Sequence, residues 1–263
     1  MKYLYKILAI VLLTACFLFA GNNKISPCDE VVINAFGEIF TFSKNRNELQ
    51  RYKDLVLINS FKDDGLGSKL SLEDPLKPVS EDPDMIHILD MGTRTIITWD
   101  RFLNLHAITS LHQTIISPSA FVVTSEHDWL IYDDHREQIL QIHSGESYPL
   151  SWGNKNYSFG IELFSVQHRV LIHQKYKNIL SFSDENGKTL SNHALPDSLK
   201  IERIFPLNLN EIVILSSDGL FLWKLPQKSL RYLSNIKNVI HVDNFSTSSL
   251  RVITRDGAIN YLP

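Results

Sequence analysis

The stretch that decides the fold of this chain is residues 85–100, which read MIHILDMGTRTIITWD. An apolar segment that begins at Ile86 runs into a polar turn around Gly92, and a second apolar segment runs back out to Trp99. β-Branched and aromatic residues on both sides of a polar, glycine-containing turn are typical of a β-hairpin. The stretch therefore predicts two antiparallel strands joined by a short turn.

The same pattern recurs further along the chain. Residues 131–139 (IYDDHREQI) and 171–179 (LIHQKYKNI) align with residues 88–96, and two more hairpins, at residues 213–223 and 251–261, have tighter turns containing Asp-Gly. An Asp-Gly pair between alternating apolar runs is a strong hairpin signal, because Gly adopts a positive φ without steric cost. The hairpins follow one another at intervals of 38 to 43 residues.

The interval between the hairpins predicts the architecture of the chain. About 40 residues hold about four short strands, which is the size of one β-propeller blade. A single blade cannot bury both faces of its sheet, whereas a ring of blades can. Five clear hairpins, counted with an N-terminal one at residues 31–42, predict an all-β propeller of six blades. Five blades and a double-sheet sandwich are the alternatives.

The N-terminal part fits the repeat less regularly. Residues 29–263 are predicted to form one propeller domain, with the turn-rich residues 62–83 looped out between the first and second blades. The last repeat reaches Pro263 directly after its third strand. Because an unpaired sheet edge invites aggregation, we expect an N-terminal strand, near residues 31–33 or 40–42, to complete the last blade and close the ring.

An apolar run at residues 7–19 follows a short basic segment. It is shorter than the roughly 20 residues that span a bilayer, and it is typical of a signal peptide. Two routes of processing stay open. Cleavage after Ala20 would make residues 1–20 the signal peptide. Alternatively Cys16 is lipidated, since residues 13–16 (LTAC) resemble the bacterial lipobox. Both routes place the protein outside the cytoplasm, in the periplasm, on a membrane through a lipid anchor, or secreted.

Composition and charge exclude several classes of function. The net charge is −3, which argues against a nucleic-acid partner and against an anionic membrane surface. The two cysteines, Cys16 and Cys28, both lie near the N-terminus. The remaining chain therefore offers neither a disulfide framework nor a thiolate metal site.

The longer hairpins resemble NHL-type repeats, a family of six-bladed propellers. Residues 88–96 (ILDMGTRTI) are the best match, with the family's Asp-x-Gly turn and a following strand near Arg-x-Ile, and Trp99 and Asp100 then stand where the family often has an aromatic-Asp pair. His135 departs from the pattern, because it occupies the position where glycine is expected. The resemblance covers about residues 70–195, and it implies the blade rather than an activity.

Some propellers similar to the NHL type are metal-dependent enzymes. One type is a zinc lyase with histidine ligands around the central channel, and the corresponding candidates here are His106, His112, His168 and His241. Another type is a calcium-dependent lactonase, for which the candidates are Glu162, Asn208 and Asp243. No pair of histidines has a compact His-x-x-x-His spacing. The sequence therefore predicts no cofactor, with zinc or calcium as the alternative.

Acidic residues recur at the predicted turns, at Asp90, Asp100, Asp133 and Asp134. Aspartate oxygens commonly accept hydrogen bonds from the backbone N–H groups that follow them, so we expect these residues to stabilise turns.

Aromatic residues provide the predicted binding site. Trp99 and Trp223 lie on predicted strands and are expected to pack between blades. Trp152 lies in a loop between two blades, with Tyr148 and Tyr157 on either side. Because loops often carry binding residues, we predict that Trp152 is exposed and that these three aromatics bind a partner.

The chain contains no Gly-x-Ser-x-Gly elbow, no P-loop and no dinucleotide fingerprint. We therefore predict an exported, non-enzymatic binding or scaffold module that holds a protein, peptide or glycan on one face of the ring. The alternative is a zinc- or calcium-dependent lyase or hydrolase with its site in the central channel.

Overall fold

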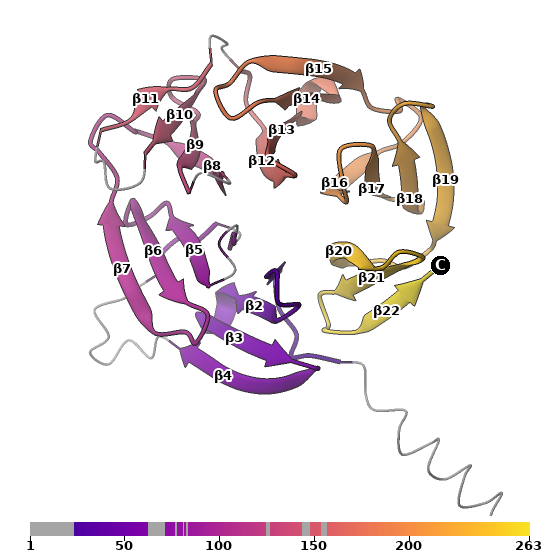
Figure 1. Ribbon diagram of the computed structural model, residues 1–263, viewed down its shortest axis with the longest axis horizontal. Helices are drawn as coiled ribbons and strands as arrows, with labels where there is room; N and C mark the ends of the chain where they lie inside the picture. Colours follow the sequence, from indigo (N-terminus) through magenta and orange to yellow (C-terminus); the bar gives the residue numbers. More distant parts are fainter. Residues whose placement is uncertain are drawn as a thin grey trace, which may run out of the picture.

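The computed structural model describes residues 24–62, 72–76, 78–80, 82, 84–124, 127–143, 148–153 and 157–263. These residues form six antiparallel sheets that follow one another around a ring (Figure 1). Each sheet is one blade, so the fold is a six-bladed β-propeller. The prediction of six blades is confirmed, and the five-bladed ring and the sandwich are wrong.

Four of the blades contain four strands each. The first blade consists of β1 (Glu30–Ile33), β2 (Ile39–Ser43), the short 3-10 helix η1 (Lys44–Arg46), β3 (Glu48–Lys53) and β4 (Val56–Lys62). The third consists of β8 (Pro118–Val123), β9 (Trp129–Asp133), β10 (Gln138–Ile142) and β11 (Leu150–Ser151). The fourth consists of β12 (Ile161–Val166), β13 (Arg169–Gln174), η2 (Lys175–Lys177), β14 (Ile179–Ser183) and β15 (Thr189–Ala194). The fifth consists of β16 (Ile201–Pro206), β17 (Glu211–Ser216), β18 (Gly219–Lys224) and β19 (Ser229–Ser234).

The second and sixth blades have three named strands each. The second consists of β5 (Met85–Asp90), β6 (Thr95–Asp100) and β7 (Leu105–Ser110), and the sixth of β20 (Val239–Ser246), β21 (Ser249–Thr254) and β22 (Ile259–Leu262). Pro75 and Val79 lie at the inner edge of the second blade, because Pro75 pairs with Asp90 and Val79 pairs with His87. The loop predicted over residues 62–83 stays a prediction, since residues 63–71, 77, 81 and 83 lie outside the described residues.

The ring closes through the N-terminal region, as predicted, but not through the predicted residues. β1 and β2 belong to the first blade, so residues 31–33 and 40–42 do not complete the last one. Instead Lys24 pairs with Ala258, and the Ile25 N–H donates to the Gly257 carbonyl at 2.9 Å. Gly257 has a φ of 85°, and a Cβ there would lie 2.0 Å from the Ile25 carbonyl oxygen. Closure therefore requires glycine at this position.

The hydrophobic core consists of six clusters, one between each pair of neighbouring blades. Trp99 lies in the cluster between the first and second blades, and Trp223 in the cluster between the fourth and fifth. Both tryptophans are buried, which confirms that they pack between blades. A large buried aromatic side chain contributes about 2–3 kcal/mol, so these contacts hold the blades together.

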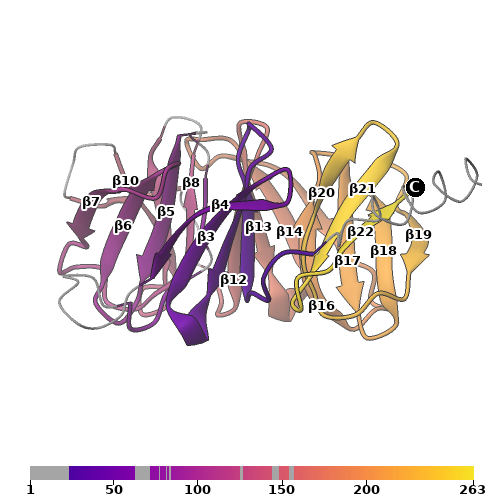
Figure 2. The ribbon, with the colours of Figure 1, turned by 90° about the horizontal axis from the view of Figure 1, so that it is seen from below.

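Consecutive strands are antiparallel, so the connections alternate between the two faces of the ring (Figure 2). We call face A the face that carries the connections between blades and the turns between second and third strands. Face B carries the connections between first and second strands and between third and fourth strands. The innermost strands begin on face A and end on face B.

Turn aspartates behave as the sequence predicts. The buried carboxylate of Asp90 accepts hydrogen bonds of 2.8–3.0 Å from the N–H of Gly92 and from two N–H groups of the connection that enters its blade. Asp133 makes the equivalent three contacts in the third blade. Asp100 accepts from the backbone of the turn that follows it. Asp134 differs, because its Oδ1 is buried without a hydrogen-bond partner in the described part of the chain.

Candidate functional site

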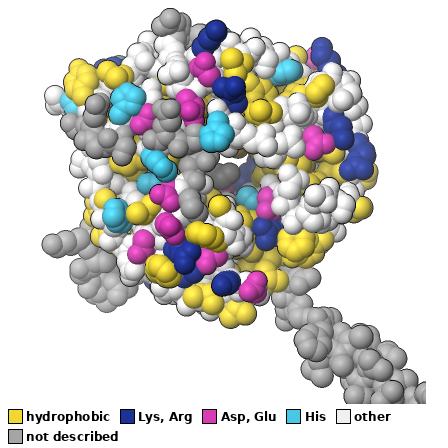
Figure 3. Space-filling model, in the orientation of Figure 1, with side chains coloured by type: hydrophobic (Ala, Val, Ile, Leu, Met, Phe, Trp, Pro, Cys, Tyr) yellow, Lys and Arg dark blue, Asp and Glu magenta, His cyan; other side chains and the backbone are white. Residues whose placement is uncertain are grey.

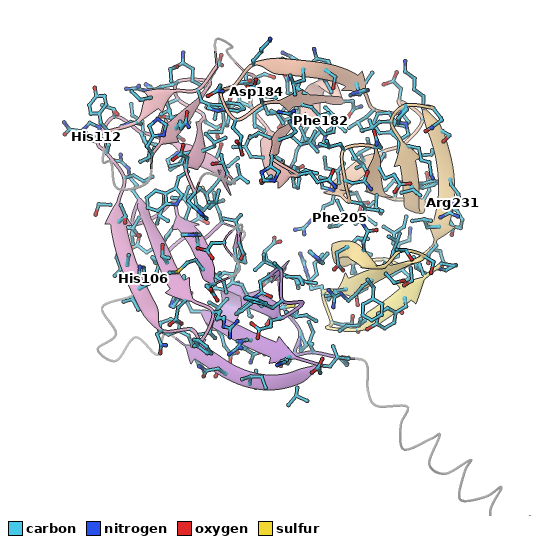
Figure 4. All side chains as sticks on the ribbon, in the orientation of Figure 1. His106, His112, Phe182, Asp184, Phe205 and Arg231 are labelled. Atoms are coloured by element: carbon cyan, nitrogen blue, oxygen red, sulfur yellow. The ribbon has the colours of Figure 1, made fainter. Side chains whose placement is uncertain are left out.

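The innermost strands of all six blades line a cavity of about 390 Å³ on the axis of the ring. Figure 3, which views face B, shows the opening at the centre of the ring. Figure 4 shows Phe205 beside this opening. The wall is mixed: apolar side chains such as Val32, Phe121 and Ile240 lie beside charged ones such as Glu162, Glu202 and Arg203. Cavities of this size accommodate small ligands or single side chains of a partner.

Charged residues gather where the inner strands begin, at the face A end of the cavity. Glu30 on β1 and Arg203 on β16 form an ion pair, with 3.1 Å between Oε1 and Nη2. These strands belong to the first and fifth blades, so the ion pair crosses the inner strand of the sixth blade. The pair therefore neutralises two charges of the channel and links blades that are not neighbours.

A second ionic group lies on the fourth blade. His173 Nδ1 and Lys175 Nζ each lie 2.8 Å from an oxygen of Glu162. Burial alone would raise the pKa of Glu162, but the hydrogen bonds from His173 and Lys175 outweigh burial and hold the pKa below its usual value. An ionised carboxylate can only accept, so Nδ1 of His173 carries a proton and donates it to this hydrogen bond. Nε2 of His173 is buried and has no partner among the described residues.

The structure does not bring the predicted metal ligands together. No group of three or more His, Cys, Asp or Glu side chains in the described residues could hold a metal ion. His106 and His112 lie at the periphery of the ring, far from the axis (Figure 4). His168 is exposed in the turn between β12 and β13, and His241 lies beside β16 near a smaller cavity.

The predicted calcium ligands each have another partner. Glu162 is bound by His173 and Lys175, as described above. Asp243 forms an ion pair with Arg251 at 2.7 Å, and Asn208 Nδ2 donates to Glu211 at 3.2 Å. The sequence offered no means of seeing these pairs, because each partner lies on a different strand or turn.

The predicted aromatic site is divided by the fold. Trp152 is 2% exposed, and its Nε1–H donates to the Glu185 carbonyl at 2.7 Å across the seam between the third and fourth blades. The prediction that Trp152 is exposed is therefore wrong. Tyr157 is also buried in this seam. Tyr148 is 60% exposed and its ring lies 4.7 Å from that of His112, so it alone of the three is available to a partner.

A different group of side chains lies on face B, where buried members support exposed ones. We call it the arginine–phenylalanine stack, and it consists of Glu38, Arg51, Phe102, Arg101 and Phe36. Glu38 and Arg51 form a buried ion pair at 2.5 Å. The guanidinium of Arg51 lies 5.0 Å from the centre of the Phe102 ring. The guanidinium of Arg101 lies 4.8 Å from Phe102 and 4.8 Å from Phe36.

The stack joins two blades. Glu38, Arg51 and Phe36 come from the first blade, whereas Arg101 and Phe102 come from the turn after β6 in the second. Figure 3 shows basic, acidic and hydrophobic side chains side by side over this part of face B. The Asn59 side chain on β4 donates to the Phe102 carbonyl at 2.6 Å and fixes this turn. Sequence reasoning missed the stack, because its members lie far apart in the chain.

The predicted N-terminal signal lies outside the described residues, which begin at Lys24. Residues 1–20 as a signal peptide and Cys16 as a lipidation site therefore stay predictions. Cys28 is described and buried, and its burial, together with the nearby Asp29 and Glu30 carboxylates, raises the pKa of its thiol to about 12. Within the described residues, no helix has the length and apolarity needed to cross a membrane.

Comparisons with known proteins agree with the fold. No protein-family model matches the chain, and no curated protein matches it. A virginiamycin B lyase from Staphylococcus aureus has a similar structure, with a TM-score of 0.61 at 11% identity over 88% of this chain and 78% of that one. U3-55K has a TM-score of 0.59 at 13% identity over 90% of this chain and 77% of that one. A protein of unknown function from Bacteroides thetaiotaomicron has a TM-score of 0.61 at 9% identity over 91% of this chain and 70% of that one.

At these identities the likeness shows the fold alone. The six-bladed ring is compatible with the NHL-type resemblance of residues 70–195. The similar structures include a protein whose name is that of an enzyme and one of unknown function. The function of this chain must therefore be argued from its own side chains.

Proposed function

We propose that this protein is a non-enzymatic binding module that acts outside the cytoplasm and holds a protein or peptide partner on face B. The observation that carries the proposal is the arginine–phenylalanine stack. Its outer members, Phe36 and Phe102, are 56% and 48% exposed although they are large and apolar. Arginine and aromatic residues dominate the binding energy of many protein interfaces.

The stack is held in place before any partner arrives. Its base is the buried Glu38–Arg51 ion pair, and Asn34 Nδ2 also donates to Glu38 at 3.2 Å. A contact surface that is already ordered loses little conformational entropy when a partner binds. A flexible loop carrying the same residues would lose more, so the fixed base favours a binding role for the stack.

The channel supports binding rather than catalysis. Two of its three carboxylates, Glu30 and Glu162, are paired with cations of the same chain, and the third, Glu202, is exposed. A general base or a nucleophile needs a group that is available to a substrate. No metal ion or other cofactor is part of the proposal.

The N-terminal sequence supports the proposed location. The apolar run at residues 7–19 directs export, and either cleavage after Ala20 or lipidation of Cys16 would follow. The mass of the N-terminal peptide of the protein isolated from its host would distinguish these two products.

Site-specific cross-linking in the native host tests the proposed function. The photoreactive amino acid p-benzoylphenylalanine replaces Phe36 in one variant and Phe159 in another. Phe159 is a matched control, because it is also 56% exposed but lies in a connection on face A. We expect a discrete cross-linked protein from position 36 and not from position 159. Equal products from both positions, or none from position 36, would contradict the proposal.

A further inference from the structure

We infer that the partner presents a carboxylate side chain to Arg101, within an extended segment whose apolar residues cover Phe36 and Phe102. This inference rests on the proposed function and names the chemistry of its partner. The two arginines of the stack differ in how far an ionic partner in the same chain neutralises them. This difference identifies Arg101 as the group that binds the partner.

The inner arginine is already neutralised. The side chains of Arg51 and Glu38 are 8% and 6% exposed, and two hydrogen bonds of 2.5 and 3.3 Å join them. The charge of Arg51 is thus balanced by a buried carboxylate of the same chain, so Arg51 serves as the fixed base of the stack.

The outer arginine is not neutralised to the same degree. The side chain of Arg101 is 29% exposed, and Asp84, its ionic partner, is 60% exposed with 3.5 Å between Nε and Oδ1. Ion pairs between exposed groups at this distance are weak, because water screens them. Arg101 therefore keeps most of its capacity to bind a second carboxylate.

The geometry of the guanidinium restricts what it can bind. The guanidinium carbon of Arg101 lies 4.8 Å from the centre of the Phe36 ring and 4.8 Å from that of the Phe102 ring. In the part of the chain that the structure describes, neither Nη atom of Arg101 has a hydrogen-bond acceptor. A planar pair of donors matches the two oxygens of a carboxylate. Once the apolar residues of the partner cover the flanking rings, water is excluded from such a bond, which strengthens it.

The charge around the site favours a single carboxylate over a polyanion. Asp84 faces Arg101, Asp100 precedes it in the chain, and the whole chain carries a net charge of −3. A phosphate backbone or a highly acidic tail would be repelled by this field. One glutamate or aspartate between apolar residues would not, and its apolar neighbours would cover the exposed rings.

Peptide titration tests the inference. The probe is an acetylated and amidated pentapeptide with a central glutamate between leucines, and its twin has glutamine in place of the glutamate. Each is titrated into the ¹⁵N-labelled mature protein while the Nε–H signal of Arg101 is followed by NMR. We expect a saturable shift with the glutamate peptide and at least tenfold weaker binding of the glutamine peptide.

Two variants assign the effect to Arg101. Arg101→Gln should remove the preference for the glutamate peptide. Arg231→Gln is the matched control, because Arg231 is an exposed arginine on the rim, in β19 of the fifth blade (Figure 4). It should leave the preference unchanged. Thermal unfolding of both variants would confirm that they are folded.

The possible outcomes separate the inference from the proposed function. Equal binding of the two peptides, or a preference that survives Arg101→Gln, would overturn the inference. Binding of a sialylated oligosaccharide in place of the glutamate peptide would overturn it too. Cross-linking at Phe36 with no glutamate preference would leave the proposed function standing, whereas absence of that cross-link would remove it whatever the peptides do.

Discussion

Blades two and three begin their second-to-third-strand turns with the same buried aspartate, Asp90 and Asp133, yet two residues later one has Gly92 and the other His135. Gly92 does not have a positive φ. A Cβ at this position would lie 2.4 Å from the Cβ of Glu73, in the connection that enters the blade. Glycine is therefore required in the second blade by a close neighbour, not by the shape of the turn, and His135 can replace it where it is exposed.

The residue with a left-handed backbone comes two positions further on. Arg94 has a φ of 56° and Glu137 a φ of 53°. The same conformation occurs at Asn47 in the first blade and Asn178 in the fourth, with φ values of 50° and 51°. The constant features of the two turns are thus an aspartate that binds backbone N–H groups and a left-handed residue before the third strand.

The largest expected effect comes from removing the aspartates. Asp90→Ala and Asp133→Ala should each lower the free energy of unfolding by about 4 kcal/mol, because three backbone N–H groups lose their acceptor in a buried site. Urea denaturation of each variant measures the loss. Asp184→Ala is the control, since Asp184 accepts from two N–H groups in an exposed turn (Figure 4). There water can replace the carboxylate, and we expect a loss below about 1 kcal/mol. A loss at Asp184 as large as that at Asp90 would show that burial is not the cause.

The sequence was informative where the interactions are local. The hairpin pattern gave the blades, and the role of Asp90 follows from a carboxylate that precedes its own turn. The glycine of the repeat suggested a requirement of the turn itself. Glycine is needed at position 92 because of its contact with Glu73, which lies outside the turn. The left-handed residue could not be seen either, since Arg94 and Glu137 are not typical of that conformation.

Contacts between blades could not be predicted from the sequence. Trp152 lies in a loop, which suggested exposure, but the next blade covers it and accepts its N–H. The same holds for a pair within the first blade. Arg51 is a charged residue on a strand, which suggests exposure to solvent, yet it pairs with Glu38 and both side chains are buried. Phe36 and Phe102 meet Arg101 only because neighbouring blades place their face B turns together. Each case depends on a partner that no local pattern indicates.

A smaller effect concerns the position three residues before each aspartate, which is His87 in the second blade and Leu130 in the third. Both side chains are buried. Burial lowers the pKa of His87 from 6.5 to about 4, the nearby Asp82 opposes the shift, and His127 and His106 add to it. Between pH 6.5 and 4 the unfolded chain therefore binds a proton that the folded chain does not.

This difference makes stability depend on pH. The contribution of a neutral His87 is fully present above pH 6.5 and falls by about 3 kcal/mol as the pH drops to 4. His87→Leu, which copies the third blade, should remove this part of the dependence. The variant should also cost about 1 kcal/mol at pH 7, because Thr98 Oγ1 loses its hydrogen bond of 2.9 Å to Nδ1. Urea unfolding at several pH values gives both quantities. A pH dependence that is unchanged in the variant would show that other groups cause it.

The smallest expected effect distinguishes the two left-handed residues. A non-glycine residue in this conformation lowers the stability of the folded chain by about 1–2 kcal/mol. Replacing it with glycine relieves this strain, but the greater conformational entropy of glycine in the unfolded chain offsets about 0.5–1 kcal/mol of the gain. Glu137→Gly should therefore raise the free energy of unfolding by about 0.5–1 kcal/mol, measured by urea denaturation. Arg94→Gly relieves the same strain, but its Nη2 donates to the carbonyls of His112 and Ile115, and the variant loses both bonds. We expect Arg94→Gly to be neutral or destabilising. A gain equal to that at Glu137 would mean that these bonds contribute nothing and that the two turns differ only in sequence.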